Sequence, residues 1–317
     1  MTDERKLPVV AVVGPTAAGK SALALRMAER LNAEIVCMDS MQIYRRMDIG
    51  TAKPTPEERR RVAHHLLDIA EPTEDFSVSE YASRAQTVLR AIHARGRTPL
   101  LVGGTGFYLK ALTDGLSLGG AKGDASVRER LEAEGQADGG KEALHQRLRD
   151  VDPTTAARLH PNDVRRVVRA LEVYELTGKP FSAQRNDASD SPFRFLVLGV
   201  TLPRERLYER IESRVDAMLR AGLVQEVRAL LQSGVSAQTQ AMQGIGYKEL
   251  VSVIENDTPL AEAAETIKRN TRHYAKRQLT WFRGDARTRW LDATDADRAL
   301  ACAEAFLRDS AMEERNA

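Results

Sequence analysis

The sequence predicts an α/β fold, in which a parallel sheet is flanked by helices and a small all-helical domain is inserted. Four short apolar runs, at residues 9–13, 33–38, 99–102 and 193–202, are typical of strands buried on both faces. Segments with helical spacing of apolar residues separate these runs, most clearly at 77–95. This alternation of strands and helices indicates a doubly wound sheet with right-handed crossovers.

The first predicted strand leads into a phosphate-binding loop. Residues 14–21 read GPTAAGKS, a complete G-x-x-x-x-G-K-[ST] pattern, and a helical segment follows them. Its two glycines let backbone N–H groups curl around phosphate oxygens, and the helix N-terminus adds a partial positive charge. Lys20 supplies a charge on a flexible stem, and the Ser21 hydroxyl can hold Mg²⁺. The fold is therefore expected to be P-loop NTPase-like, and the residues predicted to bind a polyphosphate are Gly14, Pro15, Thr16, Ala17, Ala18, Gly19, Lys20 and Ser21.

Length and composition narrow the class of protein. The 317 residues suit one large domain or two modest ones, and 42% hydrophobic residues are typical of a soluble globular chain. The formal net charge of only +2 means that any affinity for nucleic acid must come from local patches. Two cysteines are too few for a disulfide framework or a cysteine-rich zinc module. No signal peptide or membrane-spanning run is recognisable, so we expect a cytoplasmic protein with no membrane partner. We also expect a monomer.

Two further turns are predicted at the carboxyl edge of the sheet, where open α/β sheets bind their ligands. Asp39 follows the second predicted strand and could be a metal ligand, a base or the cap of the next turn. The glycine-rich turn 103–106 follows the third predicted strand and opens a helix. A hydroxyl from Thr105 could therefore reach the anion held by the first loop.

The segment after residue 43 is polar and interrupted by prolines, which predicts irregular structure around a short helix at 57–67. His64 and His65 fall within that expected helix. Adjacent residues cannot share one helix face, so their arrangement favours packing over metal binding.

The alternation of strands and helices stops after residue 116. Residues 121–189 are charged and helix-prone, without a convincing strand, before the run at 193–202 returns the chain to the sheet. We therefore predict a core domain of residues 1–120 and 190–317, with a helical insertion at 121–189.

Two predicted helices concentrate basic residues. The helix at 163–176 carries Arg165, Arg166 and Arg169, which on their own are typical of a solvated face. The last long helix, 259–282, carries most of a stretch with eight Lys or Arg and one acid between residues 268 and 289, interleaved with aromatics. Basic charge follows phosphates and aromatics stack on bases, so this stretch fits single-stranded nucleic acid as well as it fits a basic surface helix.

Six stretches together resemble the bacterial tRNA dimethylallyltransferase family, also called tRNA isopentenyltransferases. The phosphate loop is shared with many unrelated proteins, whereas the DSMQ, RALEV and KRQLTWFR segments are far more specific. The matching stretches keep the family's order and cover nearly the whole chain. They are GPTAAGKS at 14–21, DSMQIYR at 39–45, GGTGFYLKAL at 103–112, HPNDVRRVVRALEVYELTGKP at 160–180, AMQGIGYKEL at 241–250 and YAKRQLTWFR at 274–283.

This resemblance implies transfer of a dimethylallyl group from dimethylallyl diphosphate to the exocyclic N6 of the adenine 3′ of the anticodon. The loop, Lys20 and Mg²⁺ would stabilise the diphosphate leaving group, and Thr105 would add a hydrogen bond. Asp39 would take the N6 proton as the new bond forms. The resemblance thus implies that Lys20, Asp39 and Thr105 are the catalytic residues.

The resemblance also implies contacts with a tRNA anticodon stem-loop, whose target adenine must leave its stack to enter the site. Gln243 stands where some members of the family have an arginine. The positions implied to contact RNA are Asp39, Ser40, Met41, Gln42, Thr105, Arg128, Arg165, Arg166, Arg169, Gln243, Gly246, Tyr247, Lys248, Lys276, Arg277, Gln278, Trp281 and Arg283.

Three other functions remain open from the sequence. A P-loop kinase would use the same loop with ATP, and Asp39 would accept a hydroxyl proton. An isopentenyltransferase acting on free adenine nucleotides would keep the core chemistry without most of the insertion. A non-enzymatic RNA-binding switch would leave Asp39 and Thr105 unexplained.

Overall fold

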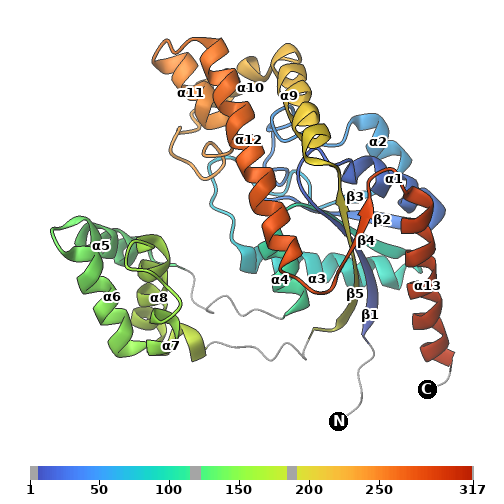
Figure 1. Ribbon diagram of the computed structural model, residues 1–317, viewed down its shortest axis with the longest axis horizontal. Coiled ribbons are helices and arrows are strands. Elements are labelled where there is room, and N and C mark those ends of the chain that lie inside the picture. Colours follow the sequence, from blue (N-terminus) through green and yellow to red (C-terminus); the bar gives the residue numbers. More distant parts are fainter. Residues whose placement is uncertain (1–5, 115–122, 184–190, 316–317) are drawn as a thin grey trace. The chain divides into compact units, whose positions relative to one another are not determined.

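The computed structural model describes residues 6–114, 123–183 and 191–315, and the chain divides into two compact units (Figure 1). The larger unit contains Met1–Thr113 and Ser191–Ala317, and the smaller unit contains Asp114–Asp190. Each unit has its own hydrophobic core.

The larger unit is built on a six-stranded sheet with the order β3-β2-β4-β1-β5-β6, in which every pair of neighbouring strands is parallel. All residues of β2 and the last five of β1 are buried, which fits strands covered on both faces. The predicted α/β class, with a parallel sheet flanked by helices, is confirmed. The strands are β1 Leu7–Val13, β2 Ala33–Met38, β3 His64–His65, β4 Thr98–Gly103, β5 Phe193–Thr201 and β6 Thr288–Asp292.

Helices pack on the sheet and extend from its carboxyl edge (Figure 1). The first and last helices, α1 and α13, share one core with inward-facing strand residues such as Val10, Val12 and Leu100. The long helix α12 packs against α9 and α11 and contacts α4 near its C-terminal end. The helices of this unit are α1 Lys20–Arg30, α2 Pro56–Arg61, α3 Val78–Ala94, α4 Gly106–Thr113, α9 Arg204–Arg220, α10 Leu223–Gln232, α11 Tyr247–Glu255, α12 Leu260–Arg283 and α13 Ala296–Arg315.

The predicted helix at 57–67 is wrong in its second half. A capping box between Thr55 and Glu58 starts α2, but the helix ends at Arg61 and Val62 is extended. His64 and His65 then pair with β2 as the edge strand β3. The His65 ring also lies 2.6 Å from a carboxylate oxygen of Glu34, an interaction between segments that local helical spacing cannot reveal.

The smaller unit contains only helices among its described residues, 123–183. Its core is formed by buried residues from α5, α6 and α8, including Leu131, Leu148 and Leu171. The elements are α5 Ala125–Gln136, α6 Gly140–Val151, α7 Pro153–Ala156, α8 Val164–Thr177 and the 3₁₀ turn η1 Phe181–Ala183. In neither unit does a described helix have the length and apolar character needed to span a membrane.

Glu226 on α10 holds together two segments that lie far apart in the sequence. Its carboxylate accepts hydrogen bonds from the backbone N–H groups of Asp48, Ile49 and Gly50, at 2.8 to 3.1 Å. The buried Tyr247 hydroxyl donates to the same carboxylate at 2.6 Å. The loop that follows Asp39 in sequence is therefore fixed to α10 and α11.

The substitution Glu226→Gln should destabilise the larger unit by about 1–3 kcal/mol, because the new amide would direct donors at backbone N–H groups. Urea denaturation followed by circular dichroism measures the loss. Glu209→Gln is the matched control. Glu209 is exposed, and its carboxylate forms only a long ion pair of 4.0 Å, from its Oε2 atom to Nη1 of the exposed Arg206, so the change to an amide should cost little. Equal stability of the two variants would show that the Glu226 contacts contribute nothing.

Candidate functional site

The phosphate loop has the backbone geometry that its two glycines predict. Gly14 has a φ of 136° and Gly19 a φ of 98°, values that favour glycine. A β carbon on Gly14 would lie 2.2 Å from the carbonyl oxygen of Val200 on β5, so no side chain fits there. The loop ends where α1 begins at Lys20, which places unpaired N–H groups of the first helical turn beside it.

Lys20 folds back onto its own loop. Its Nζ atom donates a hydrogen bond to the carbonyl oxygen of Pro15 at 2.7 Å. Burial lowers the pKa of Lys20 to about 8; the charge of Asp39 opposes this shift, and that of Arg214 adds to it. The site is therefore a desolvated position for a cation, and a bound anion would restore the proton on this amine.

Two arginines on α9 add positive charge to this loop and were not anticipated from the sequence. Arg214 donates a hydrogen bond to the Thr16 hydroxyl at 3.5 Å. Arg210 lies one turn earlier, and a β carbon built on Gly19 would be 3.5 Å from its Nη1 atom. Their i, i+4 spacing on the helix directly after β5 was the available signal, because the carboxyl end of that strand borders the loop.

Asp39 caps the turn that follows β2. Its Oδ1 atom accepts hydrogen bonds from the N–H groups of Met41 at 2.9 Å and Gln42 at 3.4 Å. Among the described residues, none donates a hydrogen bond to its other oxygen, Oδ2. The capping role is thus present in the structure, and one carboxylate oxygen remains available for a proton.

Thr105 joins the Asp39 turn to the glycine-rich turn after β4. Its hydroxyl accepts a hydrogen bond from the N–H of Ser40 at 3.1 Å, and its own N–H donates to Met38 at 3.3 Å. A β carbon on Gly103 would lie 1.9 Å from the Met38 carbonyl oxygen, so only glycine allows this approach. The structure therefore brings Asp39 and Thr105 together, beside the phosphate loop.

The side chains around these turns are largely engaged. Gln42 accepts from the Cys37 thiol and donates to the carbonyl oxygens of Thr51 and Ala52. Met41 packs against Gly244, where a β carbon would be 2.4 Å from the methionine methyl group. The stretches 39–45 and 241–250 thus contact each other, as a shared site requires.

The residues from 243 to 248 serve mainly to build α11. The Gln243 side chain donates to Ala237, and the N–H of Gly246 donates to Glu249. Tyr247 is buried, whereas Lys248 is exposed. Of the predicted RNA contacts in this stretch, Lys248 presents a charged group to solvent.

On α12 the predicted RNA residues divide into two groups. Lys276, Arg277 and Arg283 are exposed cations. Trp281 is 36% exposed and its ring lies 4.4 Å from that of Phe107, which is itself 46% exposed. Gln278, by contrast, is 5% exposed and makes hydrogen bonds inside the protein.

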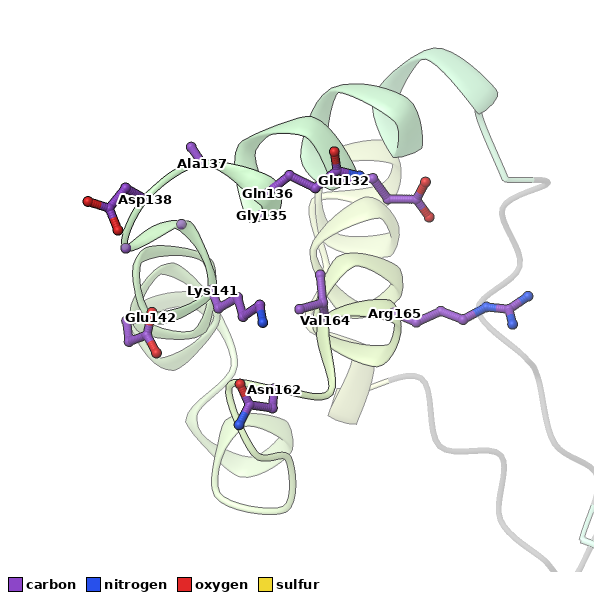
Figure 2. A pocket seen from close by; sticks show the side chains of 12 residues that line it. Glu132, Gly135, Gln136, Ala137, Asp138, Lys141, Glu142, Asn162, Val164 and Arg165 are labelled. Atoms are coloured by element: carbon purple, nitrogen blue, oxygen red, sulfur yellow. The ribbon is translucent and has the colours of Figure 1, made fainter. Parts of the chain in front are cut away.

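In the smaller unit, two of the predicted RNA-binding arginines form ion pairs with one buried carboxylate. Glu172 is fully buried and accepts hydrogen bonds from Arg128 at 3.0 Å and Arg169 at 2.8 Å. Arg166 pairs with Asp163 at 3.0 Å on the helix surface. Arg165 is exposed and borders a hollow of about 810 Å³, where Figure 2 shows Lys141 reaching towards Val164.

Another hollow, of about 880 Å³, lies in the larger unit beside α9. Its lining combines apolar side chains such as Ile49 and Met218 with arginines, among them Arg214. Arg214 thus lines this hollow and also contacts Thr16 in the phosphate loop.

Comparison with known proteins identifies the relatives of this chain. The model of the IPP transferase family matches residues 42–285, a range that excludes the widely shared phosphate loop. A tRNA dimethylallyltransferase of Geobacter metallireducens is 51% identical, covering 92% of this chain and 94% of the relative. One from Pelotomaculum thermopropionicum is 48% identical, covering 97% and 98%.

Solved structures agree with these relatives. A tRNA isopentenylpyrophosphate transferase of Bacillus halodurans is 43% identical, with a TM-score of 0.73, and the match covers 98% of this chain and 100% of that one. A eukaryotic dimethylallyltransferase acting on tRNA is 30% identical, with a TM-score of 0.80, and the match covers 96% and 80%. The likeness spans both units of the chain.

The lowered pKa of Lys20 should make diphosphate binding depend on pH. In the free protein its amine loses the proton near pH 8, as burial lowers its pKa to about 8. A bound diphosphate would keep the amine charged, so binding above that pH takes up a proton. We expect the dissociation constant of inorganic diphosphate to rise above that pH by up to about ten-fold per pH unit.

Titration calorimetry in buffers of different ionisation enthalpy measures both the affinity and the proton uptake. The variant Lys20→Met supplies the baseline from the ligand's own titration. If parent and variant show the same pH dependence, the Lys20 amine does not titrate in this range.

Proposed function

This chain belongs to the IPP transferase family, and we propose that it transfers a dimethylallyl group from dimethylallyl diphosphate to a tRNA. The acceptor is N6 of the adenine 3′-adjacent to the anticodon, and the products are N6-dimethylallyladenosine and diphosphate. The observation that supports this most strongly is the full-length likeness to tRNA dimethylallyltransferases, in a chain whose phosphate loop lies beside Asp39 and Thr105. A cytoplasmic location is part of the same proposal, and the monomeric state stays a prediction.

The phosphate loop suits the donor half of the reaction. As the allylic C–O bond breaks, its electron pair leaves with the diphosphate oxygen, and negative charge grows there. Lys20, Arg210, Arg214 and the N–H groups at the start of α1 would stabilise that charge. Such preorganised stabilisation acts on the leaving group and therefore on the transition state.

A magnesium ion would fit beside the Ser21 hydroxyl, which is exposed at the first turn of α1. No group of three or more His, Cys, Asp or Glu side chains that could hold a metal occurs in the part of the chain the structure describes. Mg²⁺ is commonly bound by one or two protein oxygens together with phosphate oxygens and water, which matches this donor set. When bound, the ion supplies charge that helps to neutralise the diphosphate.

Asp39 and Thr105 suit the acceptor half. The N6 nitrogen attacks the allylic carbon, and its proton becomes acidic as the new N–C bond forms. The Asp39 Oδ2 atom would accept that proton, while its Oδ1 atom keeps the carboxylate in place through the Met41 N–H. Thr105 would fix the turn through the N–H of Ser40.

The exposed cations provide the RNA surface. Lys276, Arg277 and Arg283 lie on α12 beside the exposed Trp281, a combination that fits unstacked bases and phosphates. The helical insertion would add Arg165. The decisive assay supplies dimethylallyl diphosphate and unmodified tRNA without ATP, and mass spectrometry then measures the mass of the RNA. The proposed enzyme would add the mass of a dimethylallyl group, whereas a kinase would give no dimethylallyl product.

Asp39→Asn should slow transfer because an amide cannot accept the N6 proton at neutral pH. We expect the single-turnover rate to fall by roughly 10²–10⁴, with both substrates still bound within a few-fold. Rapid quench with labelled donor measures the rate. If a higher concentration of Mg²⁺ or Mn²⁺ restored the transfer rate of the variant, Asp39 would be a metal ligand instead. If the folded variant transferred the group at a near-normal rate, only the capping role of Asp39 would remain.

The double variant Arg165→Ala, Arg166→Ala should weaken tRNA binding and flatten its salt dependence. Each lost phosphate contact should change the slope of log K against log salt concentration by roughly 0.7. Filter binding over a range of salt measures the slope. Arg308→Ala removes an exposed charge from α13 and is the control. A slope unchanged from the parent would assign this part of α8 to a solvated face.

A further inference from the structure

Gln278 is buried and hydrogen-bonded inside the protein, whereas Lys276 and Arg277 beside it on α12 are exposed. Its Oε1 atom accepts the N–H of Thr16, in the phosphate loop, at 2.8 Å. Its Nε2 atom donates to the carbonyl oxygen of Gly104, in the turn that carries Thr105, at 3.0 Å. The side chain is 5% exposed, so water does not compete strongly for these two bonds. One primary amide therefore bridges the two loops that meet at the reaction site.

The surrounding backbone is shaped to receive this amide. A β carbon on Gly104 would lie 2.0 Å from Nε2 of Gln278 and 3.4 Å from the carbonyl oxygen of Gly14. A side chain at position 104 would therefore clash with the amide and reach van der Waals distance from the phosphate loop, so glycine leaves room for the Gln278 side chain between the two loops. One turn earlier on α12, Tyr274 interacts with the side chains of both Gln278 and Thr105.

The chemistry of the bridge requires an amide. Gln278 must present an acceptor to Thr16 and a donor to Gly104 at the same time, and a neutral primary amide does both. A carboxylate in its place would face the Gly104 carbonyl oxygen, acceptor against acceptor. An apolar side chain would leave a buried N–H and a buried C=O without partners.

We propose that Gln278 is a positioning residue, which sets the distance between the leaving diphosphate and the Asp39–Thr105 turn rather than contacting RNA. This inference rests on the proposed transfer reaction. The phosphate loop holds the donor, and Thr105 holds the turn that carries the proton acceptor Asp39. The Gln278 bridge between the phosphate loop and the Thr105 turn therefore fixes the geometry of attack. Because neighbouring residues of α12 form the RNA surface, the same helix links RNA binding to the donor loop.

The first test replaces the amide by a carboxyl group, Gln278→Glu. At saturating concentrations of both substrates, we expect the single-turnover rate to fall by about ten-fold or more, because small misplacements of reacting groups are costly. Affinity for tRNA should stay within two-fold of the parent. The loss should shrink as the pH is lowered, since a protonated carboxyl group can again donate to Gly104 and accept from Thr16.

The second test displaces the amide from the other side. Gly104→Ala would push its methyl group into Nε2 of Gln278. The variants Gly104→Ala, Gln278→Ala and the double variant form a cycle in which the two losses should not add, because both remove one bridge. Thr280→Ala is the control on α12, since its exposed hydroxyl donates only back to Lys276. Thermal denaturation of each variant verifies that it is folded.

The outcomes separate the possible roles. Slower transfer with retained tRNA affinity, pH-dependent recovery and a non-additive cycle support the bridge. Weaker tRNA binding with an unchanged transfer rate would assign Gln278 to the RNA surface, and additive losses would separate it from Gly104. Either result overturns the inference while the parent enzyme still modifies tRNA. Failure of the parent itself to modify tRNA would instead overturn the proposed function.

Discussion

The site depends on how closely the loops at the carboxyl edge of the sheet can approach one another. A β carbon on Gly14 would meet the Val200 carbonyl oxygen at 2.2 Å, and one on Gly103 would meet that of Met38 at 1.9 Å. Each contact joins a loop to the neighbouring strand of a parallel sheet, whose carboxyl ends gather at one edge. Glycine at these positions therefore lets each turn lie directly against the neighbouring strand, at the edge of the sheet where the phosphate loop, Asp39 and Thr105 gather.

Electrostatics complements this packing. Lys20, Arg210 and Arg214 surround the phosphate loop, and the pKa of Lys20 is lowered by its burial and by the charge of Arg214. Without an anion these cations destabilise one another, so the free protein stores an unfavourable interaction that a diphosphate relieves. The same charges are in place before the leaving group forms, which is the condition for electrostatic catalysis without reorganisation.

Local sequence patterns predicted the elements whose signal is local. Apolar runs located the buried strands, and the glycine-lysine motif located the loop. Local patterns failed where the structure depends on residues far apart in the sequence. The strand β3 exists because it can pair with β2. The hydrogen bond between Thr16 and Gln278 joins residues that are 262 positions apart. Arg210 and Arg214 were missed although α9 directly follows β5, because their contacts with Thr16 and Gly19 join residues that lie far apart in the sequence.

The arginines of the helical unit show why a basic residue cannot be assigned to RNA from its type alone. Arg128 and Arg169 share the fully buried Glu172, so one of their two positive charges is already compensated within the protein. Removing either one would leave a buried carboxylate short of partners, and the resulting instability could be mistaken for lost RNA binding. Counterion release depends on charge that phosphate neutralises, so compensated arginines contribute less to salt dependence than exposed ones. With a net charge of only +2 on the chain, affinity for tRNA must come from local groups of exposed cations, such as Lys276 and Arg283 on α12.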